Sequence, residues 1–175
     1  MNKKQIAERL IENHQKFTDY ILSLSEQEFM FSHENKWTAG QQFDHILRGV
    51  SPVKMALSLP KFVPNLLFGK ANRDSRDYDN LVAKYQGKLV AGGKASGRFI
   101  PPEISFDKRE SLKNKLLKTV GELTKKIERF SEDELDEYLL PHPILGKLTL
   151  REMLYFTIYH VEHHHINGIK NLANK

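Results

Sequence analysis

Histidines gather near the end of this 175-residue sequence. Four of the eight lie in the run YHVEHHH, residues 159–165. His160 and His164 are four residues apart, so in a helix their imidazoles lie on one face, one turn apart. Two imidazoles in that geometry can hold one metal ion. The HExxH zinc motif is absent, because Val161 follows His160. A polar seam of hydrogen-bonded histidines is the alternative that this spacing leaves open.

The neighbouring histidines have less defined roles. On the predicted last helix, His163 falls on the far, solvent side and His165 falls near the centre of the apolar stripe. His14 falls on the apolar face of the first predicted helix, where a histidine is usually a packed, hydrogen-bonded core residue. The sequence leaves the roles of these three residues open.

The composition excludes several kinds of chemistry. The sequence has no cysteine, which rules out disulfides, thiolate metal sites, iron–sulfur clusters and a cysteine nucleophile. Its length, 39% hydrophobic residues and 28% charged residues are typical of a single globular domain over residues 1–175. The net charge is +5, and we interpret the basic residues Lys84, Lys88, Lys94 and Arg98 as a solvated loop, so no nucleic-acid partner is expected.

No apolar run approaches the roughly 18 residues that a membrane-spanning helix needs. The N-terminal stretch MNKKQIAERLIEN also lacks the apolar middle of a signal peptide. The absence of cysteine fits a reducing compartment. We therefore expect a cytoplasmic protein without a membrane partner.

Hydrophobic periodicity predicts four main helices. The first spans about residues 2–25. The second opens at Trp37-Thr38 with a capping box between Thr38 and Gln41, and Pro52 is expected to stop or kink it. His45 lies roughly opposite the apolar stripe of this helix, a position that by itself predicts exposure. The third spans about 108–130, and the fourth runs from a second capping box, Thr149 with Glu152, to about Leu172.

The segments between these helices are less regular. Residues 52–107 carry scattered glycines and prolines and predict a long irregular crossing, with one short interrupted helix near residues 55–66. A long crossing of this kind is often functional, and we expect it to line or cover a pocket. Ser131 is predicted to cap a brief acidic turn. The stretch LLPHPILGKLT is predicted to be extended, with a turn at Gly146. The fold expected is therefore all-α: a four-helix bundle with a long crossing between the second and third helices.

Two segments give the chain a family resemblance. TAGQQFDHI, which follows Trp37, and GKLTLREMLYFTIYHVEHHHINGI near the end resemble the DinB/YfiT-like superfamily, as does the order of the helices. The resemblance implies a four-helix bundle with a metal held by three histidines, one from the second helix and an HxxxH pair from the last. Carried over, these ligands are His45, His160 and His164.

The resemblance also implies a range of functions. Three imidazoles leave a coordination position open, as in catalytic sites, where bound water or a thiol would have a lowered pKa. Relatives use nickel, zinc, iron or manganese, and include thiol-dependent S-transferases and metal-dependent hydrolases. We expect transfer of a low-molecular-weight thiol to a small-molecule electrophile. The alternatives are a metal-dependent hydrolase and a non-enzymatic dimeric metal-binding stress protein. The thiol must come from a cofactor, since the chain has no cysteine.

A homodimer is expected on two grounds. Tyr155, Tyr159 and Ile166 are predicted to lie on the outer face of the last helix, where a monomer would favour charged residues. Members of the family are also often dimers built on helix packing.

Overall fold

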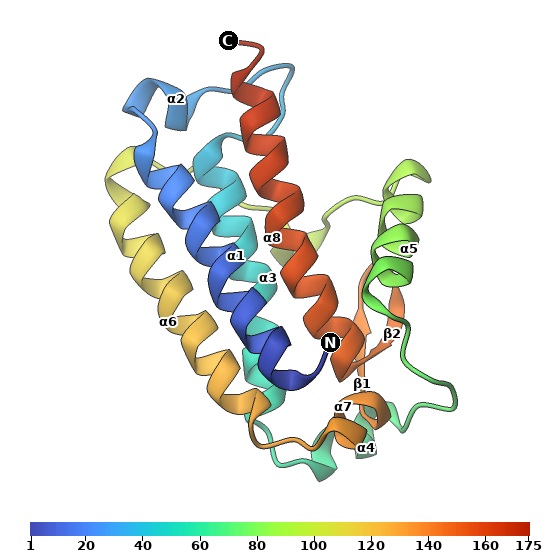
Figure 1. Ribbon diagram of the computed structural model, residues 1–175. Helices are drawn as coiled ribbons and strands as arrows, with labels where there is room; N and C mark the ends of the chain where they lie inside the picture. Colours follow the sequence, from blue (N-terminus) through green and yellow to red (C-terminus); the bar gives the residue numbers. More distant parts are fainter.

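Four long helices form the body of the protein in a computed structural model that describes residues 1–175. They are α1 (Lys3–Ser23), α3 (Ala39–Ser58), α6 (Arg109–Ile127) and α8 (Leu150–Leu172). Helices α1 and α3 each pack mainly against α6 and α8, so the two helices that come first along the chain lie on opposite corners of the bundle. Figure 1 shows α1 and α8 running one way and α3 and α6 the other. The predicted all-α four-helix bundle is confirmed.

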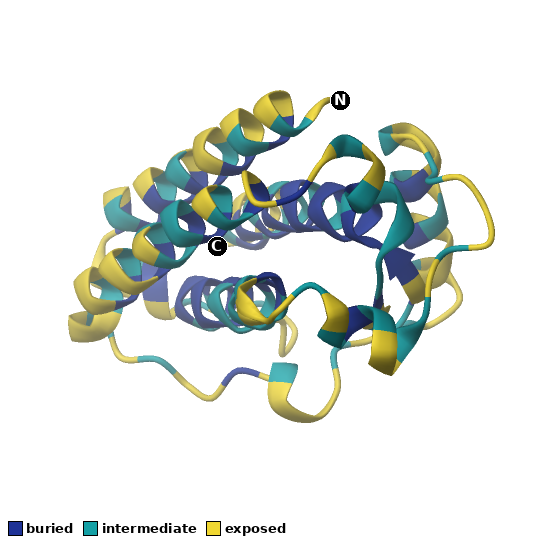
Figure 2. Ribbon diagram, turned by 90° about the horizontal axis from the view of Figure 1, so that it is seen from below, coloured by how far each residue is buried: buried dark blue, intermediate teal, exposed yellow.

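The hydrophobic core lies along the axis of this bundle. The long helices turn their buried faces toward one another and their exposed faces outward (Figure 2). Fully buried side chains come from all four, among them Phe17, Phe43, Leu116 and Ile158. Burial of apolar side chains of this size contributes about 1.5–3 kcal/mol each, so the bundle core stabilises the fold independently of any site. No helix combines the length and the hydropathy that crossing a membrane requires.

Local sequence signals mark the helix starts correctly. Thr38 caps α3 and Thr149 caps α8, each accepting a hydrogen bond from the backbone N–H of the capping-box partner, Gln41 or Glu152. Ser131 does the same for the short helix α7 (Glu132–Glu137). The extended stretch is a hairpin of β1 (Leu139–His142) and antiparallel β2 (Gly146–Thr149). Gly146 takes a positive φ of 77° at the predicted turn, a conformation open to glycine.

Pro52 was expected to stop or kink the second helix, and the first of these outcomes is wrong, because α3 continues to Ser58. Proline removes one backbone donor and breaks one helical hydrogen bond. The apolar face nevertheless continues past it with the buried side chains of Val53 and Leu57. Their burial outweighs the lost bond.

The crossing is more ordered than the sequence predicts. It contains α4 (Phe62–Phe68), α5 (Tyr78–Val90) and two 3₁₀ turns, η1 (Gly97–Phe99) and η2 (Phe106–Lys108). Hydrophobic periodicity did not predict helix α5, because this helix has only two buried side chains, Leu81 and Tyr85. Lys84 and Lys88 therefore lie on a helix and not in a solvated loop. Sequence reasoning also missed the short helix α2 (Glu26–Met30), which has its own capping box at Ser25.

Two of the three residues cited for a dimer surface are covered within the chain. Tyr155 is buried, with its ring 5.8 Å from that of Tyr78. Tyr159 is partly buried beside Tyr85 of α5. Of the three, only Ile166 is largely exposed. The missed helix α5 covers the face that periodicity assigned to solvent, so that argument for a homodimer no longer holds.

His14 is a fully buried core histidine, as predicted. Its Nδ1 lies 2.7 Å from the carbonyl oxygen of Leu10, and its Nε2 has no hydrogen-bond partner. Burial lowers the pKa of this imidazole to about 4. As the pH falls, the His14 imidazole therefore binds a proton near pH 6.5 in the unfolded chain but only near pH 4 in the folded chain.

We expect His14→Leu to make the protein less sensitive to acid. Between pH 7 and 5 the titration of His14 lowers the free energy of unfolding by about 2 kcal/mol. This part of the pH dependence should be missing in the variant when the free energy of unfolding of metal-free protein is measured with urea. His14→Gln is the matched control, because it removes the titration but keeps a buried polar group. It should reduce the pH dependence of the free energy of unfolding as much as His14→Leu does, without raising that free energy at pH 7. An unchanged slope in both variants would refute this assignment.

Candidate metal centre

Three histidines converge between α3 and α8. His45 comes from α3 and His160 and His164 come from successive turns of α8. One nitrogen from each lies within 4.8 Å of the others, and all three residues are buried. Nε2 of His45 lies 3.1 Å from Nε2 of His160. The structure thus brings together the three residues named from the sequence.

Hydrogen bonds to oxygen orient two of the three rings. Nδ1 of His45 lies 2.7 Å from the carbonyl oxygen of Phe99, and Nδ1 of His164 lies 3.3 Å from Oε1 of Gln42. A ring that donates from Nδ1 to oxygen keeps its Nε2 lone pair free for a metal. Gln42 in turn donates from Nε2 to the carbonyl oxygen of Trp37, which fixes its amide. These partners were not predicted, although Gln42 lies three residues before His45, on the same side of the helix.

The three imidazoles are neutral. Burial lowers the pKa of His45 and lowers those of His160 and His164 well below the usual value, and for His160 and His164 the neighbouring histidines add to this effect. Neutral imidazole is the form that binds metal. The His45 Nε2 lone pair faces a second imidazole nitrogen at 3.1 Å, close to the roughly 3.3 Å that nitrogens about 2.05 Å from a tetrahedral ion would have. The donor set fits a divalent cation.

His45 is buried because α3 packs two of its faces. The residue is only 6% exposed, whereas its position opposite the apolar stripe predicted exposure. Gly49, one turn further along α3, lies against the His160 ring, where a Cβ would sit 3.4 Å from the imidazole. The face that looked polar in the sequence is therefore the one that meets α8.

The other histidines do not join this cluster. His165 lies beside Phe17 and Tyr20, with ring centroids 6.0 and 4.7 Å away. His163 is half-buried next to Tyr85 and accepts a hydrogen bond from Asn167, so its predicted place on the solvent side is wrong.

A cavity of about 570 Å³ opens beside the three histidines. More than half of its 28 lining residues are hydrophobic, and none is an aspartate or glutamate. Its walls come from α3, α4, α5, α8, the hairpin and residues 93–99. The prediction that the crossing lines a pocket therefore holds.

His142 is a cavity residue that sequence reasoning missed. It lies at the end of β1 and packs its ring against Phe156, 4.2 Å between centroids. Its Nδ1 accepts hydrogen bonds from the backbone N–H groups of Ile144 and Leu145. The histidine in LLPHPILG carried no spacing signal, because the hairpin, and not a helix, positions it.

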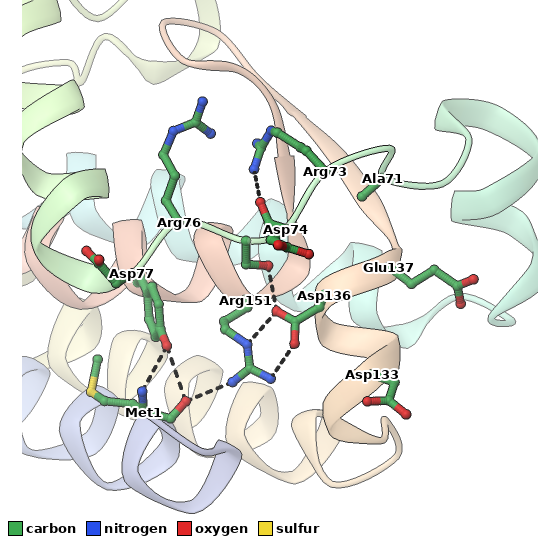
Figure 3. Close-up of a pocket in the computed structure, with 12 residues that line it drawn as sticks. Met1, Ala71, Arg73, Asp74, Arg76, Asp77, Asp133, Asp136, Glu137 and Arg151 are labelled. Atoms are coloured by element: carbon green, nitrogen blue, oxygen red, sulfur yellow. Dashed lines mark hydrogen bonds and ion pairs between the residues drawn. The ribbon is translucent and has the colours of Figure 1, made fainter.

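A second hollow lies near the start of α8 and is polar (Figure 3). Its charged groups are largely paired: Arg151 binds Asp136, and Arg73 and Arg76 both bind the buried carboxylate of Glu152. The ion pairs to Glu152 hold the segment before α5 against α8, and the pair between Arg151 and Asp136 holds α7 against α8. The hollow has no cluster of free imidazoles, so we assign it a structural role.

Comparison with known proteins identifies a family and a similar fold. The sequence model of the DinB superfamily matches residues 9–166. Among solved structures, YfiT from Bacillus subtilis, described as a probable metal-dependent hydrolase with an unusual four-helix bundle topology, is similar with a TM-score of 0.62 and 17% identity. The match covers 98% of this chain and 86% of that one. No curated protein matches significantly.

We expect one divalent ion per chain at the three histidines. His160→Ala should remove most of the bound metal after dialysis, because two remaining imidazoles hold it poorly. His45→Ala and His164→Ala should do the same. Gln42→Ala should weaken the affinity about tenfold, since it frees the His164 ring. Elemental analysis and competition with a metal indicator measure both effects.

His163→Ala is the matched control. It removes an imidazole from the same helix turn and the same cavity, yet it should leave the metal content unchanged. Full metal content in all three ligand variants would show that the site lies elsewhere.

Proposed function

Because this chain belongs to the DinB superfamily, we propose that it is a metal-dependent enzyme that transfers a low-molecular-weight thiol to a small electrophile. The observation that carries the proposal is the trio of neutral imidazoles at the wall of a cavity of ligand size. His45, His160 and His164 would hold nickel, zinc, iron or manganese, and imidazole ligands alone do not select among them. A divalent ion there would lower the pKa of a bound thiol or water.

The cavity supports catalysis over simple metal storage. A non-enzymatic metal-binding stress protein would need no ligand-sized space beside the ion. Here about 570 Å³ of largely apolar space adjoins the histidines, a volume typical of small-molecule sites. The protein itself contributes orientation and exclusion of water.

The lining favours a thiol as the nucleophile. No aspartate or glutamate reaches the cavity to serve as a general base. A thiol loses its proton near pH 8.5, far more readily than water does, and therefore depends less on a general base. The sulfur would form a bond to the electrophilic carbon, the leaving group would depart with the electron pair of its bond, and the thiol proton would end in solvent or on that group.

Hydrolysis is the second candidate. It is supported by the similarity to YfiT, which is described as a probable metal-dependent hydrolase. The two reactions differ in one requirement, because hydrolysis uses water and the metal alone.

Turnover with and without thiol separates the two candidates. Protein loaded with each of the four metals would be screened against small electrophiles and esters, with and without low-molecular-weight thiols. Thiol-dependent product formation that disappears in His160→Ala would support transfer. Equal turnover without thiol would support hydrolysis, and no turnover with any metal would favour the non-enzymatic class.

Chelation should remove the metal and the activity but not the fold. The bundle has its own apolar core, so helical circular dichroism should change little, whereas the thermal midpoint should fall because metal binds only the folded state. A thiol should perturb the visible spectrum of cobalt- or nickel-substituted protein. Loss of the helical signal on chelation would mark a structural site instead.

We further propose a cytoplasmic homodimer. The cysteine-free sequence fits a reducing compartment, and exposed apolar side chains on α4, Phe62, Leu66 and Leu67, offer a contact surface. Sedimentation equilibrium at micromolar concentration should give about twice the 20.3 kDa chain mass. A mass equal to one chain would exclude the dimer.

A further inference from the structure

One wall of the cavity carries unpaired positive charge. Residues 93–99 pass from the hairpin to the three histidines: a Cβ at Gly93 would lie 3.2 Å from the Ile144 side chain, and the Phe99 carbonyl binds His45. This segment bears Lys94 and Arg98, both of which line the cavity. Neither forms an ion pair with a carboxylate, although 15 such pairs occur elsewhere in the chain. The cavity thus has cations at its wall and no acidic residue to balance them.

His142 adds a hydrogen-bond donor of fixed position to the cavity. Because Nδ1 of His142 accepts two backbone N–H groups, it holds no proton, and the neutral ring must carry its proton on Nε2. Nε2 has no partner within the chain, and the residue lines the cavity. Burial and the nearby Lys84 ammonium lower the pKa of His142 to about 4, which keeps the ring in this neutral form.

The remaining surface is apolar. Val53, Leu59, Phe68, Leu89 and Ile144 contribute from four different segments. An ammonium group would meet the positive charge of Lys94 and Arg98, and a polyol would lose more hydration than the few polar side chains could replace. An oxyanion at one end of an apolar molecule meets both the donor and the positive charge, while its hydrocarbon part covers the apolar wall.

We propose that this cavity binds an apolar molecule that carries a carboxylate or similar oxyanion, held by the Nε2–H of His142 and favoured by Lys94 and Arg98. The inference rests on the proposed function, in that this molecule is the second substrate brought beside the metal. It also assigns His142, which is not one of the three proposed metal ligands, a role in selecting the substrate.

Three probes with the same hydrocarbon chain test the charge preference: octanoate, octanol and octylamine. Trp37 is the only tryptophan and lines the cavity, so its fluorescence reports binding. Titrations use the full chain, both metal-loaded and after chelation. Octanoate should bind about tenfold more tightly than octanol in both forms, as a charge-assisted hydrogen bond implies, and octylamine more weakly still.

His142→Asn is the sharpest variant. The asparagine side-chain oxygen replaces Nδ1 as the acceptor for the backbone N–H groups, but the Nε2 donor is lost. Octanoate affinity should fall about tenfold and octanol affinity should stay nearly constant. The exposed double variant Lys94→Ala/Arg98→Ala should weaken octanoate binding several-fold at low salt and less at high salt. Lys88→Ala, a lysine of α5 outside the cavity, is the control and should change nothing.

Several results would overturn the inference. They are equal affinity for the three probes, tighter binding of octylamine, an unchanged octanoate affinity in His142→Asn, or octanoate binding only when metal is present. Failure of the proposed function would give a different result. Octanoate would still bind to the metal-free protein, but the three histidines would take up no metal when it is supplied and no turnover would occur.

Discussion

The arrangement depends on burying three uncharged imidazoles against one another. A buried ion without a partner costs several kcal/mol, so His45, His160 and His164 can share this space only as neutral rings. Neutrality gives each ring one donor and one lone pair. His45 and His164 use their Nδ1–H donors in hydrogen bonds to Phe99 and Gln42. One nitrogen of each of the three rings lies within 4.8 Å of the others. A cation bound there would take the place of the contact between Nε2 of His45 and Nε2 of His160, which lie 3.1 Å apart.

Two separate devices keep this centre in place. The first is the bundle, in which the core faces of α3 and α8 fix the backbones that carry the ligands. The second is the buried Glu152, which binds Arg73 and Arg76 and so ties the segment before α5 to the start of α8. These hydrogen bonds lower the pKa of Glu152 to about 2 against the effect of burial. Helix α5 then places Tyr85 beside His160 and His163 and closes one side of the cavity.

The sequence predicted what depends on local periodicity and capping. Thr38, Thr149 and Ser131 marked helix starts because each side chain satisfies a backbone donor within three residues. The HxxxH pair was visible because helical spacing alone aligns it. His45 was identified only through the family resemblance, since its own helix predicts exposure. Pro52, α5 and His142 were misjudged or missed because tertiary contacts decide them: burial of Leu57, packing of Tyr85 and the hairpin around Ile144.

The three histidines and the charged residues of the cavity wall lie in different parts of the chain. The metal-facing histidines lie on two core helices, where a change of backbone would disturb the hydrophobic core. About half of the cavity wall comes from α4, α5, the hairpin and residues 93–99, which pack against the bundle from one side, and most of the rest comes from α3 and α8. Substitutions at exposed positions such as Lys94 or Arg98 would alter the charge of the cavity without moving a ligand. Under the proposed function, a change in specificity would not require a change in the metal chemistry, because different residues would carry the two properties.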